Sequence, residues 1–202
     1  MKLRNYLQQS LGLAMLLMVG ACGDKEKVAE VKQAETVQKK ADQFVFYKDI
    51  SIRPGINFEV VSWGKGVDSV GGYLILMSDS LRNNYKSLSN ERKGVITDAW
   101  NLDMDNDGNP EIYIELLSKK NVLDLNVYEY SGGSFNKITF PPLSSSMKKD
   151  YAGNDKFVIK DGDLFRTFPI VNGDSSSAKP DRLKTIRYRF SGNSFSSSVV
   201  EE

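Results

Sequence analysis

Oxygen-bearing side chains recur at every second position from residue 103 to residue 111 of this 202-residue chain. Calcium is bound in proteins by roughly six to eight oxygen atoms, so a calcium loop must bring several carboxylates to one point. The spacing predicts a calcium site, with Gly108 permitting the turn. An alternative is a turn in which the aspartates accept nearby backbone N–H groups and no ion is bound. The predicted ligands are Asp103, Asp105, Asp107, the backbone carbonyl of Asn109, and Glu111.

This loop differs from an EF-hand in its last ligand. An EF-hand has a glutamate at position 12 of the loop, and that position is Ile114 here. Glu111 comes earlier and leads directly into the apolar stretch 112–114, which is typical of a strand. In this respect the loop is similar to the strand-joining calcium loops of β-propeller and integrin-type sites. Because its protein ligands would largely saturate it, a calcium ion here is expected to fix the loop and not to catalyse.

Most catalytic arrangements lack their residues in this sequence. There is no histidine, Cys22 is the single cysteine, and there is no Gly-x-Ser-x-Gly motif. Most nucleophilic and metal-hydrolase mechanisms are therefore not expected. Asp161 and Asp163 could form a carboxylate pair, but an Asp-Gly-Asp sequence fits a hairpin turn better. The chain is accordingly predicted not to be an enzyme.

The N-terminal segment predicts export and lipidation. Two basic residues precede an apolar run over residues 11–19, which is too short to span a bilayer. Residues 1–21 are a predicted signal peptide, and their junction with Cys22 resembles the bacterial lipobox, in which the cysteine is lipidated. An ordinary signal peptide with an incidental cysteine is the alternative. Gly23 in place of aspartate favours the outer membrane of a bacterial cell envelope, by resemblance to enteric lipoproteins.

The remaining chain is predicted to be a tether followed by one domain. Residues 22–43 are charged and poor in large apolar residues, which predicts a flexible tether. Residues 44–202 are predicted to form a single β-rich domain. Without residues 1–21, which hold two of the 27 basic residues and none of the 26 acidic ones, the net charge is −1. This balance gives no reason to expect nucleic acid as a partner, and membrane attachment is expected only through the lipid.

Short segments rich in aromatic and β-branched residues, separated by Gly, Asn, Asp and Ser, predict an all-β fold. In the segment 122–130, Leu123, Leu125 and Val127 alternate with polar residues, which predicts one core face and one solvent-exposed face. The segment 78–93 shows no such alternation and is expected to be a loop or a short helix. The predicted architecture is an antiparallel β-sandwich or a barrel-like domain. The predicted strands are 44–52, 56–63, 71–77, 94–100, 111–117, 122–130, 134–140, 155–160, 163–170, 184–190 and 194–200.

Several motifs follow one another in a recognisable order over roughly residues 95–190. An acidic loop before a strand is followed by a proline motif, a Tyr-x-Gly-x-Asp-x-Phe stretch, an Arg-x-Phe-Pro strand and a tyrosine-bearing strand. The residues concerned are Asp105 to Glu111, Pro141, Pro142, Tyr151, Gly153, Asp155, Phe157, Arg166, Phe168, Pro169 and Tyr188. This order resembles the periplasmic inhibitors of invertebrate-type lysozyme and related lipoproteins. The resemblance covers about half of the chain and implies non-catalytic binding to a lysozyme.

The chain departs from that family at the inhibitory loop. By resemblance, a Ser-Gly-x-x-Tyr loop after the acidic-loop strand enters the lysozyme cleft. Here the corresponding residues are Ser118, Lys119, Lys120 and Asn121, and only the serine is shared. A lysine at this tip could pair with the two catalytic carboxylates of a lysozyme, whereas an ordinary solvated turn is the alternative. If the chain inhibits, this tip is the expected partner-binding element, and the acidic loop is expected to brace it because the strand from Glu111 ends there.

Two functional hypotheses follow. The first is a cell-envelope lipoprotein that acts by non-catalytic protein binding, with a lysozyme as the most specific candidate partner. The alternative is a calcium-stabilised structural or adhesive β-sandwich module of the bacterial envelope. Asp155 and Arg166 are expected to form a structural ion pair or turn anchor, with a functional role as the alternative.

Overall fold

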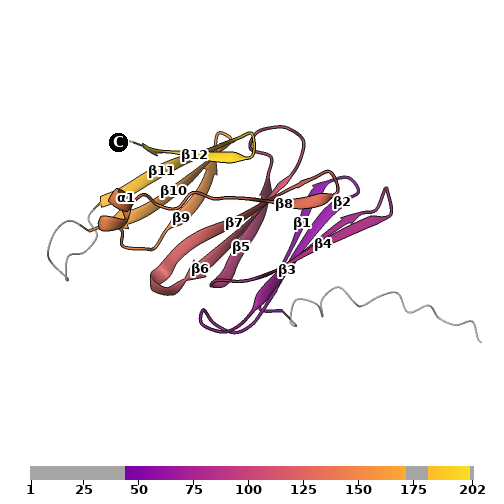
Figure 1. The fold of residues 1–202 in the computed structure, drawn as a ribbon, viewed down its shortest axis with the longest axis horizontal. Helices are drawn as coiled ribbons and strands as arrows, with labels where there is room; N and C mark the ends of the chain where they lie inside the picture. The colour runs from indigo at the N-terminus through magenta and orange to yellow at the C-terminus, as the bar shows by residue number, and fades with distance from the viewer. Residues whose placement is uncertain (1–43, 172–181, 201–202) are drawn as a thin grey trace, which may run out of the picture. The chain divides into compact units, whose positions relative to one another are not determined.

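The computed structural model describes residues 44–171 and 182–200, and this part of the chain is all-β, as predicted. Its twelve strands form three four-stranded antiparallel sheets (Figure 1). Within these residues no sheet closes on itself, which agrees with the sandwich-like alternative of the prediction. The predicted signal peptide, the lipidated Cys22 and the tether lie outside the described residues. Among the described residues, no helix is long and apolar enough to cross a membrane.

Each sheet is a meander in which strands consecutive in the sequence are neighbours. The first sheet contains β1 (Phe46–Arg53), β2 (Ile56–Trp63), β3 (Gly72–Asp79) and β4 (Asn84–Glu91). The second contains β5 (Val95–Leu102), β6 (Glu111–Ser118), β7 (Val122–Ser131) and β8 (Ser134–Ile138). The third contains β9 (Lys156–Lys160), β10 (Asp163–Ile170), β11 (Arg182–Ser191) and β12 (Ser194–Val200). Two short helical segments are also present, η2 (Lys119–Asn121) and α1 (Ser145–Lys149).

The second sheet is covered on both faces. Ile112 and Ile114 of β6 share one apolar core with Phe58 of the first sheet. Tyr113, between them, belongs to another core with Leu164 of the third sheet. A strand with both faces covered needs apolar residues at consecutive positions, which explains the uninterrupted apolar run in β6. Figure 1 shows the second sheet, which runs in colour from magenta at β5 to orange-red at β8, between the other two.

The expectation that β7 has one core face and one solvent-exposed face is wrong. Leu125 and Val127 lie in the core shared with the third sheet, as predicted. On the opposite face, however, Tyr128 is only 3% exposed and packs in the core shared with the first sheet. Asn126, on the same face, donates from Nδ2 to the Tyr73 hydroxyl at 3.1 Å. Asn126 and Tyr128 therefore face the first sheet, because the second sheet is a middle layer.

The expectation of a loop or short helix over residues 78–93 is also wrong, because β4 occupies Asn84–Glu91. β4 is an edge strand that pairs with β3 over its whole length. Most of its side chains are exposed, including Tyr85 at 81%, while Leu88 packs partly against the first core. An edge strand is held mainly by backbone pairing to one neighbour, so it can form without an alternating apolar pattern. Each of the eleven predicted strand segments does contain a strand.

Candidate functional site

The loop between β5 and β6 brings the predicted acidic residues together. One carboxylate oxygen from each of Asp103, Asp105, Asp107 and Glu111 lies within 4.8 Å of the others. The loop is closed at its base because Leu102, the last residue of β5, is the register partner of Glu111. Carboxylate oxygens gathered in this way are the ligands that calcium prefers. The structure thus brings together four of the five predicted ligand residues, while the binding of an ion stays a prediction.

Hydrogen bonds within the loop also match the alternative called self-capping here, a turn in which the aspartates accept nearby backbone N–H groups. Asp103 accepts the backbone N–H groups of Asp107, at 3.1 Å, and of Gly108, at 3.0 Å. Asn109 donates to Asp107 from its backbone N–H at 2.7 Å and from Nδ2 at 2.8 Å. An ionised carboxylate has about four acceptor sites, so these bonds leave capacity for a cation. Self-capping and calcium binding are therefore compatible, and coordination by the Asn109 carbonyl stays a prediction.

Two residues with positive φ angles and one hydrogen bond from the first sheet hold the backbone of the loop in its turn. Gly108 has a φ of 84°, in the region that favours glycine, and Asn106 has a φ of 58°, which asparagine tolerates better than most residues. Arg53, at the end of β1, donates from Nη1 to the Gly108 carbonyl at 3.1 Å. These features hold the backbone of the acidic loop in its turn.

Glu111 is an acidic residue whose hydrogen-bonding capacity the loop satisfies only in part. It is fully buried, and its Oε2 accepts the backbone N–H of Met104 at 2.8 Å. Its Oε1 is buried without a hydrogen-bond partner among the described residues, and the same holds for Oδ1 of Asp105. Burial, followed by the negative charges of the three aspartates, raises the pKa of Glu111 to about 8, against the lowering effect of the Met104 N–H. A buried carboxylate oxygen without a partner is costly, and a divalent cation in the cluster would satisfy it.

Without calcium, the chain is expected to lose stability as the pH rises, relative to a Glu111→Gln variant. The folded pKa of about 8 lies above the ordinary value of 4.5. The folded protein therefore binds the proton more tightly, so this stabilisation is complete below pH 4.5 and is lost as the pH rises through about 8. A single proton limits the slope to about 1.4 kcal/mol per pH unit. Urea unfolding of both proteins in chelator measures the difference, and parallel pH profiles would contradict it.

The predicted partner-binding tip connects β6 to β7. Ser118 ends β6 and donates from Oγ to the Val122 carbonyl at 3.0 Å, which closes the hairpin. Lys119 forms an ion pair with Asp68 at 2.7 Å, and both side chains are about 70% exposed. Asn121 has a φ of 57° and completes the turn. The side chain of Lys120 is outside the described part of the structure. The tip therefore presents at least one lysine on the surface.

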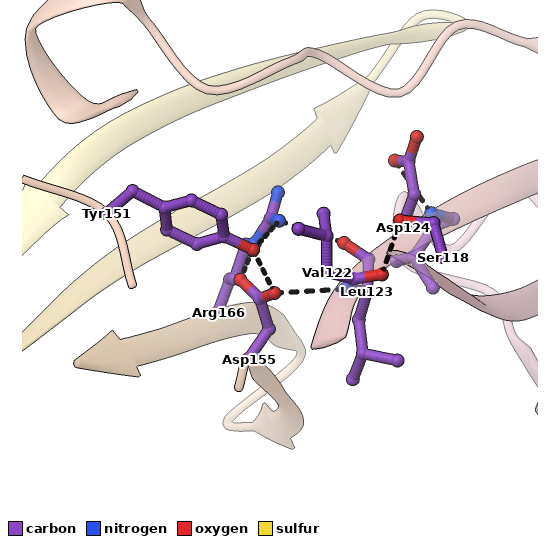
Figure 2. Close-up of polar contacts among 8 residues, drawn as sticks. Ser118, Val122, Leu123, Asp124, Tyr151, Asp155 and Arg166 are labelled. Carbon is purple, nitrogen blue, oxygen red and sulfur yellow. Dashed lines mark hydrogen bonds and ion pairs between the residues drawn. The ribbon is translucent and has the colours of Figure 1, made fainter. Parts of the chain in front are cut away.

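The base of the tip is anchored by residues that precede or belong to the third sheet (Figure 2). The Asn121 carbonyl accepts the backbone N–H of Asn154 at 2.7 Å. The Leu123 N–H donates to Oδ2 of Asp155 at 3.0 Å, and the Leu123 carbonyl accepts from Nη2 of Arg166 at 2.9 Å. β8 pairs with β7 only from Val127 onward, so the start of β7 lacks a strand partner on that side. Asp155 and Arg166 supply the hydrogen bonds that such a strand would have made.

Asp155 and Arg166 also form a buried ion pair, as predicted. Nε of Arg166 lies 2.7 Å from Oδ1 of Asp155, with side-chain exposures of 4% and 0%. The Tyr151 hydroxyl donates to Oδ2 of the same carboxylate, and the guanidinium lies over the rings of Tyr151 and Phe157, at 5.8 Å and 5.4 Å. Burial alone would lower the pKa of Arg166, but the hydrogen bond and charge of Asp155 raise it. The Arg166 guanidinium is thus held in the charged state.

The acidic loop and the tip lie at opposite ends of β6, which is eight residues long. At about 3.3 Å per residue, the strand separates them by roughly 23 Å. The expectation that the acidic loop braces the tip is therefore wrong. The Tyr151–Asp155–Arg166 network lies nearer and holds the base of the tip instead. These three residues belong to the sequence motifs, but the motifs do not indicate that Asp155 and Arg166 bind the Leu123 backbone, because a backbone contact leaves no signal in residue type. Comparisons with protein-family models, curated proteins and solved structures found no match to the chain.

Proposed function

We propose that the chain is a cell-envelope lipoprotein, anchored through Cys22, whose β domain binds another protein without catalysis. The supporting observation is the combination found at the 118–121 tip: Lys119 is well exposed, while the adjoining Leu123 backbone is fixed by the buried Asp155–Arg166 pair. A presented element that is already ordered loses less conformational entropy when it binds. Rigid anchoring of an exposed tip is therefore suited to insertion into a partner's cleft.

The proposed partner is a lysozyme. The motif order resembles the periplasmic inhibitors of invertebrate-type lysozyme, and a lysozyme cleft contains two carboxylates that a lysine could approach. The Lys119–Asp68 ion pair is mostly exposed, and exposed pairs contribute at most about 1 kcal/mol. Lys119 can therefore exchange Asp68 for a carboxylate of the partner at small cost.

With the chain in excess, lysis of bacterial cell wall by one of three lysozymes (invertebrate-type, chicken-type or goose-type) is expected to be suppressed. A Lys119→Ala/Lys120→Ala variant is expected to inhibit at least about tenfold less, the equivalent of ~1.4 kcal/mol, because charge-assisted contacts to the cleft are lost. The matched control is Lys148→Ala/Lys149→Ala, which removes a lysine pair from α1. Failure to suppress any of the three enzymes would contradict the proposal.

A second candidate function is a calcium-stabilised structural or adhesive module of the envelope. It is favoured by the buried Oε1 of Glu111 and Oδ1 of Asp105, which lack partners in the described structure and belong to the four-carboxylate cluster. Calcium bound there would order the loop between β5 and β6 and supply no chemistry. If no lysozyme is inhibited, the calcium-stabilised module becomes the favoured function.

A further inference from the structure

A polar pocket of about 250 Å³ lies between the first and second sheets, apart from both the acidic loop and the tip. Its walls come from β3 and β4 on one side and from β6, β7 and β8 on the other. Tyr73 and Tyr128 line it from opposite sheets, and Asn90 lies beside Tyr73 as its register partner on β4. The pocket lies where the solvent-exposed face of β7 had been expected.

The two tyrosines leave one hydroxyl proton unused. Their oxygens are 2.5 Å apart and share one hydrogen bond, and Asn126 donates from Nδ2 to the Tyr73 oxygen at 3.1 Å. Each hydroxyl carries one proton, so whichever tyrosine donates to the other, the second proton remains available. Both rings are buried, and burial raises the pKa of Tyr73 and of Tyr128, which keeps the hydroxyls protonated. The pocket floor therefore offers a hydrogen-bond donor that the described residues do not use.

Asn90 adds a second unused donor. Its Nδ2 is buried and has no acceptor among the described residues. A buried donor without an acceptor destabilises the folded state, so an acceptor oxygen placed beside this amide would be favoured. Two unsatisfied donors in one pocket indicate a ligand, or ordered water, that presents oxygen atoms to the floor.

The rim carries balanced charge. Two carboxylates, of Glu91 and Asp124, and two ammonium groups, of Lys93 and Lys137, line the opening and are all exposed. Balanced charge gives no preference for a net anion or a net cation, while it supplies both acceptors and donors to hydroxyl groups. Leu116 contributes an apolar surface to the wall.

We propose that this pocket binds one residue of a neutral, amide-bearing sugar of the N-acetylhexosamine class. A carbonyl oxygen of the amide would accept from Asn90 and from the tyrosine pair, and the ring hydroxyls would meet the charged rim. The pocket volume of about 250 Å³ suits a small ligand such as one sugar ring. This site is independent of the proposed inhibition, because it uses neither the tip nor the acidic loop.

Titration of the ¹⁵N-labelled full chain with N-acetylglucosamine, followed by NMR, tests the proposal. Saturable shifts are expected for the side-chain amides of Asn90 and Asn126. An Asn90→Ala variant is expected to bind about three- to tenfold more weakly, as the loss of one hydrogen bond predicts. Asn84→Ala, on the same strand but outside the pocket, is the matched control and is expected to bind as the wild type does.

Two further comparisons keep the test decisive. Lys137→Ala changes an exposed rim residue whose loss does not endanger folding, and this variant is expected to bind the sugar more weakly. Lys86→Ala on β4 is the control and is not expected to weaken binding. Glucose, which lacks the amide carbonyl, is expected to bind more weakly than N-acetylglucosamine. Absence of saturable shifts, equal weakening by Asn84→Ala, equal binding of glucose, or tighter binding of glycine betaine or acetate would each overturn the proposal.

Discussion

Removal of calcium with a chelator is expected to lower the melting temperature of the wild-type chain by about 5–10 °C. Calcium at about 100 times its Kd would stabilise the folded state by ~2.7 kcal/mol, and each kcal/mol corresponds to about 2–4 °C in a domain of this size. The physical reason is Glu111, whose buried Oε1 has no protein partner and whose charge is opposed by three neighbouring aspartates. Differential scanning calorimetry in calcium and in chelator measures the change.

An Asp105→Asn variant separates calcium binding from loop structure. In calcium the variant is expected to melt well below the wild type, because one charged ligand is lost. In chelator it is expected to melt at the same temperature or higher, because the charge of Asp105 then adds to the repulsion around Glu111. Asp161→Asn, in the exposed turn between β9 and β10, is the matched control and should change neither value. Equal losses in calcium and in chelator would contradict a metal site.

Most of the fold could be predicted because, in most strands, every second side chain faces an apolar core while the side chains between them face a different environment. In the predicted strand 184–190, for example, Ile186, Tyr188 and Phe190 alternate with Arg187 and Arg189, and β11 buries these three apolar residues. β4 was missed because it is an edge strand held by backbone pairing to β3, which residue types do not encode. The middle position of the second sheet was missed as well. The apolar run Ile112–Ile114 is consistent with a strand buried on both faces, but it does not say which sheets cover it.

The part of the candidate site that is made of residues close in the sequence could be predicted. The part that depends on contacts between residues distant in the sequence could not. The spacing of the acidic residues was sufficient to place four carboxylates together, because all of them lie in one nine-residue loop. The complete burial of Glu111 could not be read from the spacing of the acidic residues. The anchoring of Leu123 joins residues 32 and 43 positions apart, and one side of each contact is a backbone group that any residue would provide.

The buried ion pair is expected to be the polar contact whose loss costs the most stability. Asp155→Ala should destabilise the chain by about 3–5 kcal/mol, because it leaves the Arg166 guanidinium buried and unpaired. The matched control is Lys48→Ala, which breaks a pair with Asp98 at the same separation of 2.7 Å but with side chains 44% and 47% exposed. That change should cost at most about 1 kcal/mol. Urea unfolding of the variants gives both values, and similar losses would contradict the argument from burial.

A double substitution, Asp155→Leu with Arg166→Met, distinguishes charge burial from anchoring. Removal of both charges avoids the unpaired guanidinium, so part of the lost stability is expected to return. The Leu123 N–H and carbonyl remain without their partners in this variant, however, because neither new side chain can hydrogen-bond. Amide exchange of Leu123 is therefore expected to stay fast, and inhibition through the tip to stay weak, even as the melting temperature recovers. If exchange at Leu123 slowed to the wild-type rate, the ion pair would contribute to stability but would not order the tip. The β6–β7 hairpin alone would then order the tip.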